Sequence, residues 1–285
     1  MRSVAPVLTV LAVIGVVWYV ATVWMNSTWV YDQAARAGEE VSFAQLVPLT
    51  MAQKSPVLPA PHQVVVGLWQ GLTGYAVSSP KSLVYHAWVT LSGTVLGFLI
   101  GTGLGVLLAV GIVHNRAMDM SVLPWAIASQ MVPIIALAPM LAVVMNVLGA
   151  SALVTKAIIS AYLSFFPLVV GMVKGLRSPE VSQLDLLTTY AASGSNVFWK
   201  LRLPASMPYF FASLKVGIAA SLVGAIVAEL NQQAGLGARL LQGSYYSQTV
   251  QIWAALLLAA TMAAVLVMIM GRIEGRVLEQ MGMRR

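Results

Sequence analysis

The sequence predicts an all-α, polytopic membrane protein. Of its 285 residues 59% are hydrophobic and only 9% are charged, and the mean hydropathy is +0.84. Soluble domains contain about 25% charged residues, so this composition excludes a soluble globular enzyme, a disordered chain and a nucleic-acid-binding domain. The apolar residues form six stretches, each of the roughly 20 residues that a membrane-spanning helix needs. These stretches are 5–25, 86–112, 121–147, 153–173, 209–230 and 250–271.

The first stretch follows Arg2, as the apolar part of a secretion signal would. Its apolar run nevertheless continues from Val4 to Met25, beyond the roughly 7–15 residues typical of such a signal. We therefore expect residues 1–80 to form a retained transmembrane anchor followed by an external segment. Within that segment, an apolar pattern with helical spacing follows Pro61 and predicts a short helix at the outer membrane surface.

Basic residues indicate the orientation of the chain. Cytoplasmic segments of membrane proteins carry an excess of Lys and Arg. With the N-terminus inside, ten basic residues fall in cytoplasmic segments and five lie in or near external ones, which predicts six spans with both termini in the cytoplasm. The ten are Arg2, Arg116, Lys174, Arg177, Lys200, Arg202, Arg272, Arg276, Arg284 and Arg285, and the five are Arg36, Lys54, Lys81, Lys156 and Arg239.

The second span has a glycine at every fourth position, at Gly93, Gly97, Gly101 and Gly105. This spacing lets two helix backbones approach closely inside a membrane. The pattern predicts a tight contact with another span, which could be static packing or a sliding contact.

The third span contains Pro124, Pro133 and Pro139 together with polar Gln130 and Asn146. A proline inside a helix removes a hydrogen bond and kinks the helix. Irregular backbone at membrane depth is tolerated only where protein or a water-filled cavity surrounds it. We therefore expect a kinked span that lines the interior of the protein.

The fifth span holds two charges, Lys215 and Glu229, 14 residues apart. At 1.5 Å per residue they lie roughly 21 Å apart and cannot pair with each other. Because a charge facing lipid costs about 2.5–3.5 kcal/mol, Glu229 should face protein or water. It could hold the following Gly235-Leu236-Gly237 segment through backbone N–H groups, close an outer gate, or simply be a solvated helix end. The connection 231–249 is predicted to be an external loop or a re-entrant turn.

No pattern in the chain indicates an enzyme. The sequence has no cysteine, no GxxxxGK[ST] phosphate-binding loop and no GxSxG nucleophile motif. His62, His86 and His114 lie far apart, without the spacing of metal ligands. The sequence therefore predicts no catalytic residues, no bound metal and no cofactor.

Residues 178–208, between the fourth and fifth spans, predict a cytoplasmic helix–turn–helix. Ser178 and Pro179 are typical of a helix start, Gly194 marks the turn, and Pro204 and Pro208 mark the end. Exposed apolar side chains on the cytoplasmic side indicate a surface that docks onto another protein. The apolar residues at helical spacing are Leu184, Leu187, Tyr190, Ala191, Val197, Phe198 and Leu201.

This segment resembles the EAA loop of permease subunits in bacterial binding-protein-dependent ABC importers. The loop reads E-A-A-x3-G, then nine residues, a hydrophobic residue, one residue and L-P. With Leu203-Pro204 as the anchor, Asp185 stands at the glutamate, Leu186 and Leu187 at the alanines, Ala191 at the glycine and Leu201 at the hydrophobic position. Two further features are similar to those permeases: the proline-kinked segment 131–141, and an acidic residue, Glu229, before Gly-Leu-Gly.

The resemblance covers residues 56–276 and is strongest to the nitrate/sulfonate/taurine class. It implies a type I importer permease fold with six transmembrane helices in the bacterial inner membrane, and residues 81–285 as a permease core. It implies ATP hydrolysis in separate cytoplasmic ATPase subunits, a second permease subunit (identical or related), and an extracytoplasmic solute-binding protein. The solute is open between nitrate, sulfonate, taurine, pyrimidine-like and riboflavin-like compounds.

The resemblance also implies roles for individual residues. The ATPase-coupling residues would be Asp185, Leu186, Leu187, Tyr190, Ala191, Ala192, Ser193, Leu201, Leu203 and Pro204, and the candidates for the translocation path or gate are Gln130, Pro133, Pro139 and Glu229. The alternative function is a stand-alone secondary transporter or channel. Such a protein would not need a cytoplasmic docking helix.

Overall fold

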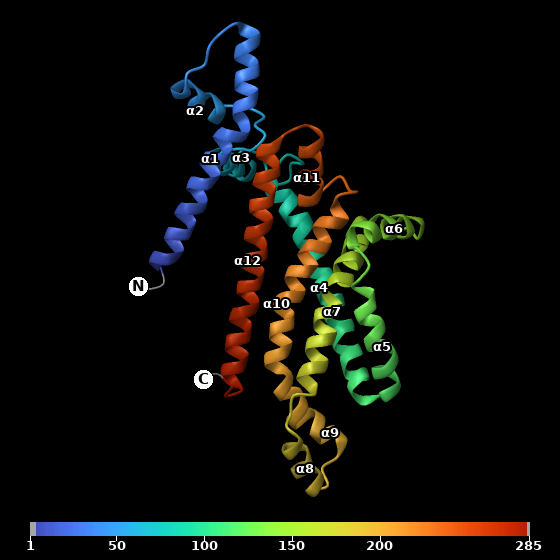
Figure 1. The fold of residues 1–285 in the computed structure, drawn as a ribbon. Helices are drawn as coiled ribbons and strands as arrows, with labels where there is room; N and C mark the ends of the chain where they lie inside the picture. Colours follow the sequence, from blue (N-terminus) through green and yellow to red (C-terminus); the bar gives the residue numbers. More distant parts are fainter. Residues whose placement is uncertain (1–3, 284–285) are drawn as a thin grey trace. The chain divides into compact units, whose positions relative to one another are not determined.

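The computed structural model describes residues 4–283, and every regular element in that range is helical (Figure 1). The prediction of an all-α polytopic membrane protein is confirmed. Five helical segments are long and apolar enough to cross a membrane. These are α1 (Val4–Ala37), α4 (Leu83–His114), α7 (Ala152–Leu176), α12 (Thr249–Gln280), and α10 (Leu203–Glu229) together with the short α9 (Gly194–Val197) and the π-helical η1 (Phe198–Arg202) that precede it.

The predicted third span is broken rather than kinked. It consists of α5 (Arg116–Ser129) and α6 (Ile134–Val147), which meet at an angle of 100° and make a sixth span only if they are counted as one (Figure 1). Pro133 is the N-cap of α6. It has no N–H group and disfavours helical backbone in the residue before it, so the helix ends and restarts there. Pro124 and Pro139 lie inside their helices.

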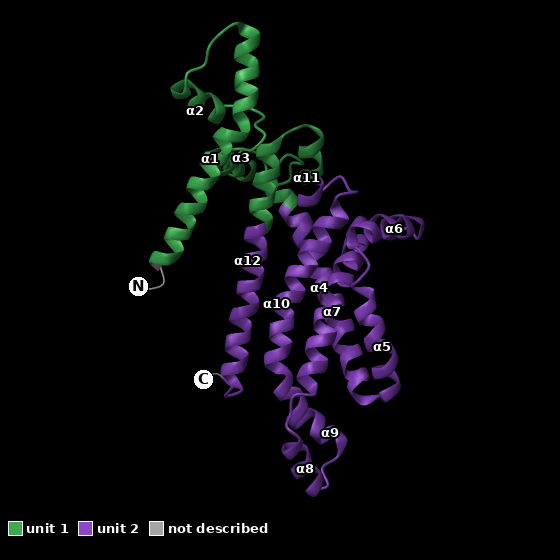
Figure 2. Cartoon of the chain, in the orientation of Figure 1, with its two compact units in different colours: residues 1–86, 239–259 green, residues 87–238, 260–285 purple. Residues whose placement is uncertain are grey.

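The described chain forms two compact units (Figure 2). Unit 1 contains residues 1–86 and 239–259, and within it lie α2 (Phe43–Met51) and α3 (Pro61–Thr73). The helix predicted after Pro61 is therefore confirmed. Asn26 of α1 fixes the segment before α3, since its side chain donates to the Leu58 carbonyl at 2.8 Å and accepts from the Val57 N–H at 2.8 Å.

Unit 2 contains residues 87–238 and 260–285, and α4, α7 and α10 form its core. The predicted glycine contact lies between α4 and α7. A Cβ atom on Gly97 would lie 2.7 Å from the Ala157 carbonyl oxygen, and one on Gly105 would lie 2.6 Å from Leu168 Cβ. Because neither position has space for a methyl group, the two backbones can approach this closely only with glycine. The prediction of a tight helix contact is confirmed.

The connection after α10 is more regular than the sequence predicts. It contains the helix α11 (Leu236–Tyr245) instead of only a loop or re-entrant turn. Its glycines serve close packing: a Cβ on Gly243 would lie 2.6 Å from Ile252 Cγ1. Gly235, with φ of +114°, makes the turn that leads into α11.

The segment 178–208 differs from its prediction at three points. Helix α8 (Val181–Thr189) begins after Glu180, whose N–H donates to the Gln183 side chain, and not after Ser178. The turn lies at residues 190–193, and Gly194 begins α9. Pro204 and Pro208 do not end a helix, because Pro204 occupies the first turn of α10, where a missing N–H group costs little, and Pro208 is accommodated within α10.

Candidate functional site

Helix α8 presents apolar side chains to solvent. None of its residues is buried. Leu186 is 57% exposed, and Tyr190 and Trp199, which follow α8, are 77% and 63% exposed. We call Leu186, Tyr190, Trp199 and the exposed Val181 the loop surface. Asp185 is also exposed. An exposed apolar surface on a short helix is typical of a binding site for another protein.

The turn after α8 depends on Ala191, whose φ is +51°. This left-handed conformation costs an L-residue about 1–2 kcal/mol and costs glycine almost nothing. The glycine of the EAA-type pattern therefore stands where the backbone favours glycine, and Ala191 adopts the same turn with strain. Ala192 N–H then donates to the Leu187 carbonyl at 3.0 Å, and Ser193 caps α9 by accepting from Asn196 N–H.

The base of the segment is fixed to neighbouring helices. Arg202 Nη1 donates to the Leu176 carbonyl at the end of α7, at 3.2 Å. The Phe198 ring meets the His114 ring at the end of α4 edge-on, with centroids 5.3 Å apart. Since α9 and η1 continue directly into α10, only the turn at residues 190–193 separates α8 from the long helix. The half-buried residues Leu201, Leu203 and Pro204 lie in this continuous part.

A second candidate site surrounds Glu229, whose side chain is completely buried at the C-terminal end of α10. Lys156 Nζ lies 3.2 Å from its Oε1 atom. Thr90 Oγ1 donates to Oε2 at 2.8 Å, and Gly237 N–H donates to the same oxygen at 3.1 Å. We call Thr90, Lys156, Glu229 and Gly237 the Glu229 cluster.

The Glu229 cluster lies within unit 2 and brings together residues from four helices. Its residues come from α4, α7, α10 and α11. Lys156 also donates to the Val89 carbonyl at 3.1 Å, and Thr90 Oγ1 also accepts from Leu236 N–H at 2.9 Å. A buried charge is tolerated only when it is paired and hydrogen-bonded, and here both charged partners meet that condition. The cluster can therefore lock α11 onto the end of α10.

Gly235 leaves the space that the carboxylate occupies. A Cβ atom at this position would overlap the Glu229 carboxylate, and the φ of +114° is open only to glycine. The Glu229 carboxylate thus fits against the Gly235-Leu236-Gly237 segment only because position 235 is a glycine. The prediction that Glu229 faces protein or water is confirmed, and of the alternatives for its role the structure shows the hydrogen bond to the backbone N–H of Gly237. The alternative of a solvated helix end is wrong, because the side chain is 0% exposed.

Sequence reasoning missed the partners of Glu229. Lys156 and Thr90 are 73 and 139 residues away along the chain, and no local pattern links them. A signal existed in Lys156 itself, which is a cation within an apolar stretch and needs an anion. As predicted, Lys215 does not pair with Glu229; it forms an ion pair with Glu274 of α12 at 2.7 Å.

The other candidates for a path lie at and after the break between α5 and α6. Gln130 is the C-cap of α5, and its buried Nε2 atom has no hydrogen-bond partner. Pro133 and Pro139 are exposed in the chain. Ala138 of α6 packs with Ala228, so α6 lies beside the end of α10, although none of the contacts described for Glu229 involves these three residues. Within residues 4–283 no three His, Asp or Glu side chains gather as metal ligands would.

Comparison with known proteins finds one family of transport proteins and relatives that are named as permeases. The family described as binding-protein-dependent transport system inner membrane component matches residues 101–280. A probable ABC transporter permease protein of Haemophilus influenzae is 30% identical over 179 residues, which are 62% of this chain and 71% of that protein. The formylaminopyrimidine transport permease protein ThiX of Halalkalibacterium halodurans is 29% identical over 64% of this chain and 68% of its own. The riboflavin transport system permease protein RibX of Chloroflexus aurantiacus is 28% identical over 76% and 78%.

Proposed function

Because this chain belongs to the family of binding-protein-dependent transport system inner membrane components, we propose that it is the permease subunit of an ATP-driven importer. The observation that supports this most directly is the loop surface. A chain without a phosphate-binding loop of its own displays exposed apolar side chains on α8, at the positions that resemble the EAA loop. A separate cytoplasmic ATPase would supply the energy, and residues 81–285 would form the permease core.

In this proposal α8 sits in a cleft of the ATPase, and the movement of that cleft on ATP binding is transmitted through η1 to α10. Six of the ten EAA-type residues divide into two roles. Asp185, Leu186 and Tyr190 would contact the ATPase, since they are exposed. Leu201, Leu203 and Pro204 would transmit the movement, since they lie in the continuous helix.

Co-purification with the ATPase tests this assignment. Leu186→Arg places a charge in the middle of the proposed interface, where burying it unpaired costs several kcal/mol. We expect this variant to insert into the membrane normally and to lose the ATPase during purification.

The matched control is Val77→Arg, which replaces another exposed apolar residue, in the connection between α3 and α4. It should retain the ATPase. If Leu186→Arg and the control retain equal amounts of ATPase, α8 is not the docking helix.

We further propose that the solute is a small heteroaromatic compound delivered by a solute-binding protein. The relatives named for formylaminopyrimidine and riboflavin transport are 29% and 28% identical to the chain, whereas the putative aliphatic sulfonates transport permease protein SsuC of Bacillus subtilis is 22% identical. A second permease copy, identical or related, would complete the path. The termini would both be cytoplasmic, as the distribution of basic residues indicates.

We also propose that the Glu229 cluster belongs to the outer gate of the path. It lies at the opposite end of α10 from the coupling segment, and it fixes α11 to that end. A movement of α10 driven from the cytoplasmic side would be passed along the helix to this cluster. Gln130, Pro133 and Pro139, around the α5–α6 break, would line the path next to it.

A further inference from the structure

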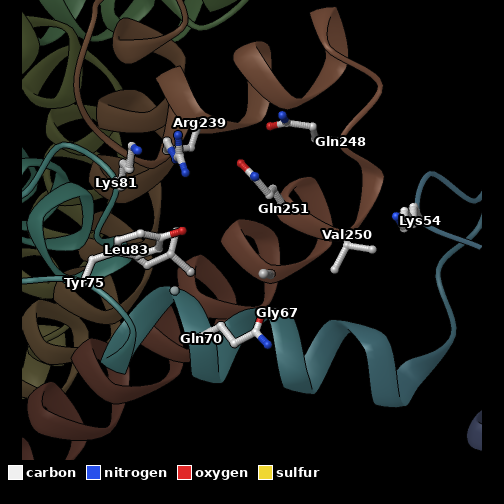
Figure 3. Close-up of a pocket in the computed structure, with 12 residues that line it drawn as sticks. Lys54, Gly67, Gln70, Tyr75, Lys81, Leu83, Arg239, Gln248, Val250 and Gln251 are labelled. Carbon is white, nitrogen blue, oxygen red and sulfur yellow. The ribbon is translucent and has the colours of Figure 1, made fainter.

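Unit 1 contains a pocket of about 330 Å³ whose charged lining is entirely basic (Figure 3). Lys54, Lys81 and Arg239 contribute three positive charges, and no Asp or Glu lines it. Gln70, Tyr75 and Gln251 add amide and hydroxyl groups that can donate hydrogen bonds. Figure 3 shows Arg239 and Lys81 near each other at one end, with Lys54 at the far side. The pocket is not part of the coupling segment or the Glu229 cluster.

The guanidinium group of Arg239 in this pocket lacks a partner for one of its hydrogen-bond donors. Its Nη1 atom donates to Gln242 Oε1 at 3.5 Å, while its Nε atom is buried and has no hydrogen-bond partner. Burial lowers the pKa of Arg239 from its ordinary value, although an arginine stays protonated at physiological pH. In the part of the chain that the structure describes, none of the three cations forms an ion pair. Lys54 and Lys81 are exposed, whereas Arg239 is half-buried, so the unpaired Nε atom of Arg239 is the group that an anion in the pocket would stabilise most.

Helix α3 indicates where such an anion comes from. One side of α3 carries Gly67, Gln70 and Gly71 into the pocket wall. The other side exposes Val65, Val66 and Trp69. A helix with one apolar, tryptophan-bearing face is typical of the membrane–water interface. The pocket on its polar side therefore lies at the depth of lipid headgroups.

We propose that this pocket binds a phosphate group, supplied by the headgroup of an anionic phospholipid. A phosphate offers several oxygen acceptors, which suits one guanidinium and two ammonium groups in a single site. The amide and hydroxyl donors of Gln70, Tyr75 and Gln251 could bind its remaining oxygens. The ligand would neutralise Arg239 and hold α3, α11 and the start of α12 together within unit 1.

The test uses the full-length chain in nanodiscs of neutral phosphatidylcholine. Binding of short-chain phosphatidylglycerol and of inorganic phosphate is titrated separately by native mass spectrometry. We expect Arg239→Gln and Lys81→Gln to weaken phosphatidylglycerol binding by about tenfold each, the size of effect of one lost charge-assisted hydrogen bond. Arg36→Gln is the matched control, because it removes an exposed basic residue outside the pocket and should leave binding unchanged.

The arms of the titration distinguish the sources of phosphate. Phosphatidylglycerol binding that depends on Arg239 and is not displaced by inorganic phosphate supports the lipid. Binding of inorganic phosphate that depends on Arg239 supports a phosphate site filled from solution. Binding of neither probe, or equal binding by Arg239→Gln and Arg36→Gln when circular dichroism shows both folded, overturns the proposal.

Discussion

At the scale of single residues, the most constrained side chain is Glu229. Its carboxylate is removed from solvent and satisfied by Lys156, Thr90 and Gly237. Removing one member of a buried ion pair costs about 3–5 kcal/mol, because the other charge stays buried without a partner. The cluster is therefore a stabilising contact that a single substitution can disrupt.

We predict that Glu229→Gln lowers the thermal unfolding midpoint of the purified chain and disturbs transport, since it leaves Lys156 uncompensated. Adding Lys156→Met to the same chain should recover much of the lost stability, because the two effects are coupled. Glu274→Gln is the matched control: its partner Lys215 is about one third exposed, so solvent screens the charge and the midpoint should fall less. Equal unfolding midpoints for wild type and Glu229→Gln would show that the Glu229 cluster does not stabilise the chain.

At Ala191, in contrast, we predict a substitution that stabilises the chain. Because its φ is +51°, Ala191→Gly should relieve strain worth about 1 kcal/mol, and hydrogen–deuterium exchange along α8 should slow. At the neighbouring position, Ala192→Gly should speed exchange, because it adds backbone freedom without relieving strain. Exchange that is faster in both variants would contradict the interpretation of this turn.

At the scale of elements, the glycines of α4 set the distance to α7. We predict that Gly97→Ala destabilises the chain by about 1–3 kcal/mol, because the new Cβ would lie 2.7 Å from a backbone oxygen that cannot move aside. Gly103→Ala, on the same helix, has no atom within 4 Å of the new methyl group and should be neutral or slightly stabilising. Thermal unfolding of the two variants compares them directly. Similar losses in the two variants would mean that the close contact between α4 and α7 does not determine the effect, because helix propensity alone would favour alanine at both positions.

Elements with a long apolar pattern could be predicted from sequence, and their ends and breaks could not. The five long spans and the helix after Pro61 follow from hydrophobicity and periodicity alone. Pro133 stands at a helix break while Pro139 and Pro208 lie inside helices, and proline alone does not distinguish the two cases. Helix α8 starts after Glu180 and not after Ser178, because the Ser178 hydroxyl donates to the carbonyl oxygens of Gly175 and Ala205 instead of capping α8.

At the scale of the whole molecule, sequence reasoning reached the family because its signature is local. The EAA-type pattern and the Gly-Leu-Gly segment each lie within a few tens of residues. Contacts between distant segments were not predictable: neither the Lys156–Glu229 pair nor the basic pocket, which combines residues 54–83 with 239–254, leaves a pattern in one sequence. The sequence therefore predicted the central residue of the candidate site, Glu229, but not its partners Lys156 and Thr90.

The central claim is that this chain transports a solute only when an ATPase drives it. The most direct measurement is uptake of a radiolabelled heteroaromatic solute by proteoliposomes that contain the permease, its ATPase and its solute-binding protein, with matched vesicles that lack the ATPase. We predict ATP-dependent uptake in the complete vesicles, and none without the ATPase even when a proton or sodium gradient is imposed. Gradient-driven uptake by the permease alone would contradict the claim and identify the chain as a secondary transporter.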